Sequence, residues 1–101
     1  MKHSFKLSVK AKVDLTKIAV FTEQRWGRTQ RNNYLFQLDQ SFHQLADNPD
    51  IEVSCDYIMQ GYRQFPLASH IVFYKVSNVN IVEIIRILHK SRLPEAQFSG
   101  E

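Results

Sequence analysis

The chain opens with a strand-like pattern and continues with a helix-like one. Residues 5–9 alternate between apolar and polar side chains, which predicts a short strand with one buried face. From Val9 to Trp26 the apolar residues recur at helical spacing. Ser8 stands where an N-cap is needed, and Gly27 follows the last turn. We therefore expect a helix that begins near Val9 and ends before Gly27.

A second helical pattern follows almost at once. Its apolar stripe runs from Tyr34 to Ala46, with Thr29 as the expected N-cap and Asn48-Pro49 as the stop. The two helices would be separated by about two residues, so they must run antiparallel as a helical hairpin.

The second half of the chain returns to strand patterns after a polar loop. Residues 62–65, 70–76 and 80–89 are rich in β-branched and aromatic side chains, with Pro66 and Ser77-Asn78 as expected breakers. The last run is apolar at both odd and even positions, which is typical of a strand buried on both faces. We expect it at the centre of the sheet, between the first strand and the strand before it.

These elements predict an α+β fold, in the order strand, helix, helix, strand, strand, strand. The helical hairpin would cover one face of a small, mainly antiparallel sheet. A chain of 101 residues is expected to form one domain, residues 1–101, with residues 91–101 as a flexible tail. No apolar run approaches the ~20 residues that a membrane span needs, so a soluble, cytoplasmic protein is expected.

Charge is distributed unevenly along the chain. Residues 1–31 carry eight Lys or Arg and two acids, whereas residues 32–61 carry five acids and no Lys or Arg. This asymmetry predicts a basic side that attracts nucleic acid or an acidic protein segment, unless it is only a solvated helix face. The single cysteine, Cys55, is interpreted as a free thiol in a reducing compartment.

The sequence contains no pattern of a common catalytic or cofactor site. The three glycines lie far apart, which argues against a phosphate-binding loop. The four histidines lie in different predicted elements without i, i+4 spacing, so neither a metal nor a cofactor is expected.

Arg86 is the most unusual residue, because it lies between two isoleucines in the expected central strand. Burying an unpaired guanidinium costs several kcal/mol. Arg86 must therefore pair with an acid from another element or emerge on an open sheet face. Arg63, His89 and Lys90 would share that face or its rim. Such a cluster of one histidine and several cations suits either phosphate binding or RNA cleavage, with the histidine as general acid, or docking on an acidic protein.

Trp26 is expected mainly as a core residue that closes the hairpin, with a contact role as the alternative. We therefore take Trp26, Arg63, Arg86, His89 and Lys90 as candidate partner contacts.

Four stretches in this order and spacing resemble the ParE toxins of the RelE/ParE superfamily, over about residues 7–91. They are LSVKAKVDLTKIAVFTEQRWG, LADNPDI, GYRQFPLASHIVFYKV and IVEIIRILHKS. The resemblance implies a small toxin of a type II toxin–antitoxin system that poisons DNA gyrase and blocks replication. It also implies a ParD-like antitoxin that folds on the toxin, across the helical hairpin and often at the sheet edge. A homodimer or a toxin–antitoxin hetero-oligomer is equally compatible with it.

The superfamily also contains ribosome-dependent mRNA endonucleases of the RelE type, which form the alternative. Compared with those nucleases, this chain has Ile71 where an arginine is usual, and Tyr62 and Gln64 where basic residues are usual. Lys90 matches their last arginine only in charge, and Ala96 stands near their tyrosine. Few groups would remain to stabilise transition-state charge, so the resemblance favours a non-enzymatic inhibitor.

Overall fold

The computed structural model describes residues 4–48, 53–54, 61–78 and 81–91. Its elements are, in chain order, β1 (Ser4–Leu7), α1 (Val9–Trp26), α2 (Arg28–Asp47), β2 (Val53–Ser54), β3 (Arg63–Leu67), β4 (His70–Asn78) and β5 (Ile81–His89). The predictions for Cys55 and for the tail from residue 92 lie outside the described residues.

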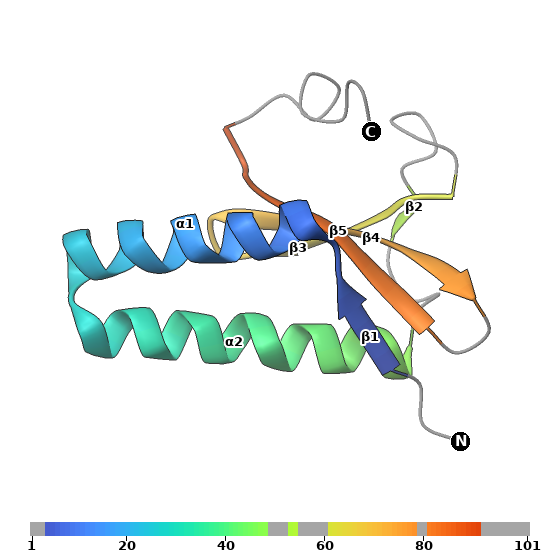
Figure 1. Ribbon diagram of the computed structural model, residues 1–101, viewed down its shortest axis with the longest axis horizontal. Helices are drawn as coiled ribbons and strands as arrows, with labels where there is room; N and C mark the ends of the chain where they lie inside the picture. The colour runs from blue at the N-terminus through green and yellow to red at the C-terminus, as the bar shows by residue number, and fades with distance from the viewer. Residues whose placement is uncertain (1–3, 49–52, 55–60, 79–80, 92–101) are drawn as a thin grey trace.

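A helical hairpin covers one face of a mixed sheet (Figure 1). The strand order is β1-β5-β4-β3-β2, in which β1 and β5 are parallel and the other pairs are antiparallel. Both helices pack against β1 and β5. The predicted α+β fold is confirmed, and so is the central place of the last strand between the first strand and β4.

The ends of α1 agree with the prediction from sequence. The Ser8 hydroxyl accepts a hydrogen bond from the backbone N–H of Ala11 at 3.0 Å, which satisfies one of the free donors of the first turn. At the other end, the Gly27 N–H donates to the carbonyl of Glu23 at 2.9 Å. Gly27 has a φ of 96° and a ψ of 171°, a conformation that essentially only glycine adopts.

The predicted N-cap of α2 is wrong by two residues. Thr29 does not cap the helix, because α2 already begins at Arg28 and Gly27 is its N-cap, without a side-chain cap bond. The Gly27 carbonyl accepts from the N–H of Arg31 at 3.1 Å. One residue thus ends α1 and starts α2, which a glycine permits because it can reverse the chain in a single step.

The predicted strand breaks also need correction. Pro66 lies within β3, opposite Ile71, and Ser77-Asn78 belong to β4. A proline is tolerated at this place because β2 pairs only with Arg63 and Gln64, so Pro66 stands where β3 has no described neighbour on that side. The two-residue strand β2 was predicted as loop, since two residues are too few to show a period.

The apolar side chains of β5 point to both faces of the sheet because the strand contains a bulge. Phe73 is opposite Arg86 and Tyr74 is opposite Ile84, which leaves Ile85 as an extra residue in β5. Residues on β5 before and after the bulge therefore change faces. Val82, Ile84 and Ile87 pack into the core under the helices, whereas Ile85 and Leu88 join a second cluster with Tyr62 and Phe73.

Candidate functional site

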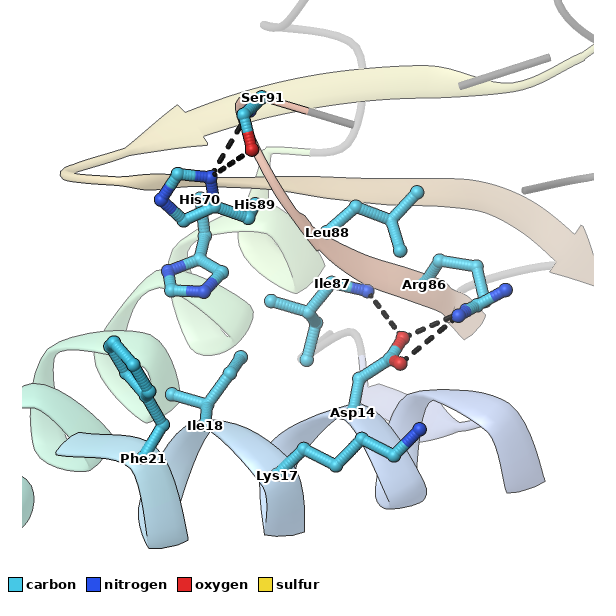
Figure 2. A pocket seen from close by; sticks show the side chains of 10 residues that line it. All are labelled: Asp14, Lys17, Ile18, Phe21, His70, Arg86, Ile87, Leu88, His89 and Ser91. Atoms are coloured by element: carbon cyan, nitrogen blue, oxygen red, sulfur yellow. Dashed lines mark hydrogen bonds and ion pairs between the residues drawn. The ribbon is translucent and has the colours of Figure 1, made fainter. Parts of the chain in front are cut away.

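A buried ion pair joins α1 to the bulge of β5. The Arg86 guanidinium donates to both carboxylate oxygens of Asp14, with Nε–Oδ2 at 2.8 Å and Nη2–Oδ1 at 3.1 Å. Figure 2 shows these two hydrogen bonds between α1 and β5. The Arg86 and Asp14 side chains are only 12% and 9% exposed, respectively. This confirms the ion-pair interpretation of Arg86, with a partner from another element. The alternative, an unpaired guanidinium on an open sheet face, is wrong, because the Asp14 carboxylate of α1 engages the guanidinium.

Asp14 of α1 and the N-cap residue Ser8 also form hydrogen bonds with backbone groups around the bulge. The Asp14 carboxylate accepts from the N–H of Ile87 at 3.0 Å. The Ser8 hydroxyl donates to the carbonyl of Ile85 at 2.7 Å, and the Ser8 N–H donates to the carbonyl of Ile84 at 2.9 Å. A bulge disrupts the regular ladder, so these bonds replace contacts that the neighbouring strand does not supply.

Asp14 was not among the candidate residues, although the sequence held a signal for it. It lies on the same helical face as Ala11, Ile18 and Thr22, and all four residues are buried. An acid on the apolar stripe of one element and an arginine in the apolar run of another require a common explanation. Each would be costly to bury alone, so mutual pairing is the simplest one.

A histidine pair lies at the end of β5. His70 of β4 is opposite His89 of β5, and the two rings meet edge to face with centroids 5.5 Å apart. The Tyr34 hydroxyl lies 2.6 Å from His70 Nδ1 and 3.3 Å from the carbonyl of Leu67. Three elements, α2, β4 and β5, therefore hold the two rings in place.

The tautomer of His89 follows from its hydrogen bonds. The backbone N–H of Ser91 donates to His89 Nδ1 at 3.1 Å, and the Ser91 hydroxyl lies 2.8 Å from the same nitrogen. Since Nδ1 accepts a bond from a backbone N–H, the proton of the neutral ring is on Nε2.

Burial sets the protonation of this corner of the molecule. It lowers the pKa of His70, and repulsion from His89 acts in the same direction, while Asp14 partly opposes both. Burial likewise raises the pKa of Tyr34, against a smaller opposite effect of the Ser69 backbone. At neutral pH the His70 ring is therefore uncharged and unsuited to act as a cation.

A pocket of about 310 Å³ lies between α1 and β5. The ion pair lines one end of it and the histidines line the other (Figure 2). Asp14, Lys17 and Arg86 lie toward one end, and His70, His89 and Ser91 toward the other. Ile18, Phe21, Ile87 and Leu88 form the apolar remainder of the lining. Its mixed lining suits a bulky side chain with a polar end from another protein.

The structure gathers only part of the predicted contact set. Arg86 and His89 both line this pocket, and Lys90 follows it as an exposed residue. Arg63 begins β3 and pairs with Ser54, away from the pocket lining.

Trp26 lies elsewhere, at the end of α1, and is 63% exposed. The core role expected for it is therefore wrong. Gly27 reverses the chain at this point without a need for side-chain packing, which leaves the indole in solvent.

A second hollow, of about 370 Å³, lies between the helices and β1. Phe5, Leu7, Leu15, Leu35 and Phe42 supply most of its apolar wall, and Asp39 and Thr16 lie in its lining. We call it the hairpin groove. Strand β1 is the last strand on its side of the sheet among those the structure describes, so the groove adjoins a strand edge.

The described residues contain no cluster of three or more side chains that would hold a metal ion. No helix in the described ranges is long and apolar enough to cross a membrane.

Comparison with known proteins decides the family. The profile of the family described as "ParE toxin of type II toxin-antitoxin system, parDE" matches residues 5–94. The chain belongs to the ParE toxin family. This confirms the resemblance found in the sequence.

Two relatives of this ParE-family chain carry the same name. Toxin ParE1 of Caulobacter vibrioides is 39% identical over 87 residues, which covers 86% of this chain and 88% of the relative. Toxin ParE1 of Mycobacterium tuberculosis is 36% identical over 90 residues, with 89% and 92% covered.

A solved structure supports the fold of this ParE-family chain. A chain from the structure titled "Chromosomal ParDE TA system from P. aeruginosa" superimposes with a TM-score of 0.75 and 18% identity. The match covers 87% of this chain and 96% of the other. The family match makes this chain a toxin of a type II toxin–antitoxin system, and the superposition gives it the α+β fold of that structure.

Proposed function

We propose that this ParE-family toxin poisons DNA gyrase in the cytoplasm, and that a ParD-like antitoxin neutralises it. The observation that carries the proposal is the family match over residues 5–94, which names the parDE system. In this proposal the toxin acts by binding to another protein. Its own side chains do not catalyse the cleavage of any bond in the target.

The engagement of Arg86 supports a non-enzymatic mechanism. Cleavage of a phosphodiester needs cationic donors that are directed at the developing charge. The Arg86 guanidinium instead holds Asp14 through two hydrogen bonds and is mostly buried. Turning it toward a substrate would leave the Asp14 carboxylate buried and unpaired, which costs several kcal/mol.

The pocket between α1 and β5 supports docking on a protein. Phe21 is 60% exposed at its edge, and Lys17 and Lys90 add exposed positive charge nearby. An apolar hollow rimmed by cations favours a partner that inserts one large side chain and presents acids around it. We assign this surface to the gyrase contact.

The hairpin groove supports a different partner, the antitoxin. Its lining is mainly apolar, it lies between the two helices, and it adjoins the β1 edge. An amphipathic helix can fill such a groove while a following segment pairs with the strand edge. Asp39 is the only charged residue in the groove lining, whereas Lys10 and Lys12 on α1 are exposed, so an acidic segment fits beside the groove.

The proposal is tested with purified gyrase and relaxed plasmid. Addition of the toxin should inhibit supercoiling and trap cleaved DNA, and prior addition of the cognate antitoxin should prevent both effects. The variant that tests the assigned surface is Phe21→Asp, which alters an exposed residue of the pocket and should reduce trapping at least about tenfold. Normal supercoiling at all toxin concentrations would reject the gyrase assignment.

The RelE-type nuclease is retained as a second candidate because of one observation, the paired rings of His70 and His89 beside Lys90. A histidine pair can serve as acid and base in RNA cleavage. The toxin would then cut mRNA on translating ribosomes and leave gyrase unaffected, and Lys90→Ala would abolish the cutting. Intact mRNA in that assay would dismiss this candidate.

A further inference from the structure

The connected end of the helical hairpin projects past the sheet (Figure 1). We call residues 23–33 the hairpin tip. None of these residues is buried, whereas Thr22 before them and Tyr34 after them are. The tip therefore contributes little to the core, and its residue types need another explanation.

The hairpin tip carries more positive charge than its own acidic residue neutralises. Glu23 is its only acid, and Glu23 forms an ion pair with Arg31 across the hairpin. Arg25 and Arg28 remain exposed, and neither makes an ion pair with any residue that the structure describes. Two uncompensated guanidinium groups thus flank the turn at Gly27.

Between these two arginines lies the only tryptophan of the chain. Trp26 is 63% exposed, and the Arg25 guanidinium lies 5.3 Å from the centroid of its ring. An exposed indole offers a partner a large, rigid aromatic surface. The arginine contact orients the ring and leaves exposed area for a second stacking partner.

The surroundings of Trp26 distinguish between kinds of partner. Its neighbours are polar, with Gln24, Thr29 and Gln30 exposed on the same tip. A protein interface usually centres on an apolar core that encloses its aromatic anchors. Binding of single strands instead combines arginine contacts to phosphates with stacking of bases on an aromatic ring.

We propose that the hairpin tip binds single-stranded nucleic acid, with phosphates on Arg25 and Arg28 and a base stacked on Trp26. The contact is independent of sequence, because stacking and phosphate contacts recognise every base alike. It is separate from the gyrase and antitoxin surfaces, so the proposed function stands or falls independently of it.

The position of Trp26 makes the test direct. Its emission is the only indole signal of the chain, so an oligodeoxythymidylate of about 15 nucleotides should quench it on binding. Fluorescence anisotropy of a labelled oligonucleotide gives the affinity in parallel. Between about 50 and 200 mM salt, two phosphate contacts predict a slope of log K against log salt near about −1.4.

Matched variants distinguish binding at the hairpin tip from non-specific binding to the positive charge of the whole protein. Arg25→Gln/Arg28→Gln should remove most of that salt slope, and Trp26→Ala should weaken binding about 5- to 100-fold. The control is Lys10→Gln/Lys12→Gln, which removes two charges at the other end of α1 and should change affinity less than about twofold.

Three outcomes would overturn the proposal. In the first, anisotropy reports binding while Trp26 emission is unchanged, which places the nucleic acid elsewhere. In the second, the lysine control loses as much affinity as the arginine variant. In the third, poly-glutamate alters the emission and the oligonucleotide does not, which identifies an acidic protein segment as the partner.

Discussion

The Asp14 carboxylate holds Arg86 and the backbone of Ile87 at the same time, with one oxygen 2.8 Å from Arg86 Nε and 3.0 Å from the Ile87 nitrogen. It thereby connects the middle of α1 to the strand segment that follows the β5 bulge. The same bonds occupy the cation that was the best candidate for phosphate chemistry. Structure and proposed mechanism therefore depend on one ion pair.

Removal of one partner of this pair should destabilise the toxin strongly. Asp14→Ala leaves Arg86 buried without a counter-charge and should lower the free energy of unfolding by about 3–5 kcal/mol. Replacement of both residues in Asp14→Leu/Arg86→Met should recover most of that loss, because no unpaired charge remains. Urea unfolding of the single and double variants measures the coupling.

The ion pair at the hairpin provides the control for this cycle. Glu23→Gln breaks the contact with Arg31. Because the Glu23 and Arg31 side chains are 42% and 27% exposed, respectively, the free energy of unfolding should fall by at most about 1 kcal/mol. If Asp14→Ala cost no more than Glu23→Gln, the buried pair would not be the connection described here.

The single-residue turn of the hairpin makes a second prediction. Gly27→Ala forces a side chain into a conformation with a φ of 96°, although nothing lies within 4 Å of the new Cβ. The cost is backbone strain alone, on the order of 1–3 kcal/mol. Thermal unfolding should show it, and Thr29→Ala should be within about 0.5 kcal/mol of the parent because Thr29 is not the cap. A larger loss in Thr29→Ala than in Gly27→Ala would restore Thr29 as the N-cap.

Stability should depend on pH through His70. Its pKa is lower in the folded than in the unfolded chain, mainly because the ring is buried. The unfolded state then binds more protons, so the folded state loses stability as pH falls below the unfolded value of about 6.5, and the loss ends below the folded pKa. Above that window the contribution is complete. His89 and Asp14 face the same ring, so the slope belongs to the cluster.

Unfolding measured from about pH 5 to 8 tests this dependence. His70→Gln should reduce the slope in the acidic part of the range. His43→Gln is the control, because its ring is 60% exposed on α2 and lies outside the cluster. An equal slope in the parent and in His70→Gln would assign the pH dependence to other groups.

The hairpin groove predicts how the antitoxin can be excluded without loss of the toxin. Ala19 lies in the groove lining and is partly exposed. Ala19→Trp should fill part of the hollow and weaken antitoxin binding at least about tenfold, while gyrase inhibition persists. Calorimetric titration with the antitoxin measures the effect. Gln44→Trp, on an exposed face of α2 outside the lining, should bind normally; equal affinities of both variants would place the antitoxin elsewhere.

Local patterns predicted the elements well, because each depends on neighbours in sequence. Ser8 caps α1 through a residue three positions away, and Gly27 ends it through one four positions away. The helical and alternating periods needed no tertiary information. The error at Thr29 arose because one residue, Gly27, both ends α1 and begins α2. The error at Pro66 arose because β3 has no described neighbour on one side at that position, so a proline is tolerated there.

The candidate site was predicted only in part. His89 and Arg86 do line one pocket, but Trp26 is exposed on the hairpin tip and Asp14 was missed. The exposure of a side chain depends on the packing of the whole molecule. The sequence around a tryptophan beside a turn is therefore the same whether the turn is covered or projects into solvent.

The sequence by itself determined the two helices, four of the five described strands, their order and the family, since these follow from short-range periods and from motifs in a fixed order. Only the tertiary structure decided which acid pairs with Arg86 and which ring lies against His70. Asp14 lies 72 residues before Arg86 in the sequence, and Tyr34 lies 36 residues before His70. The bulge at Ile85 decides which side chains of β5 face α1, and a shift of one residue in register leaves no trace in a run that is apolar on both faces.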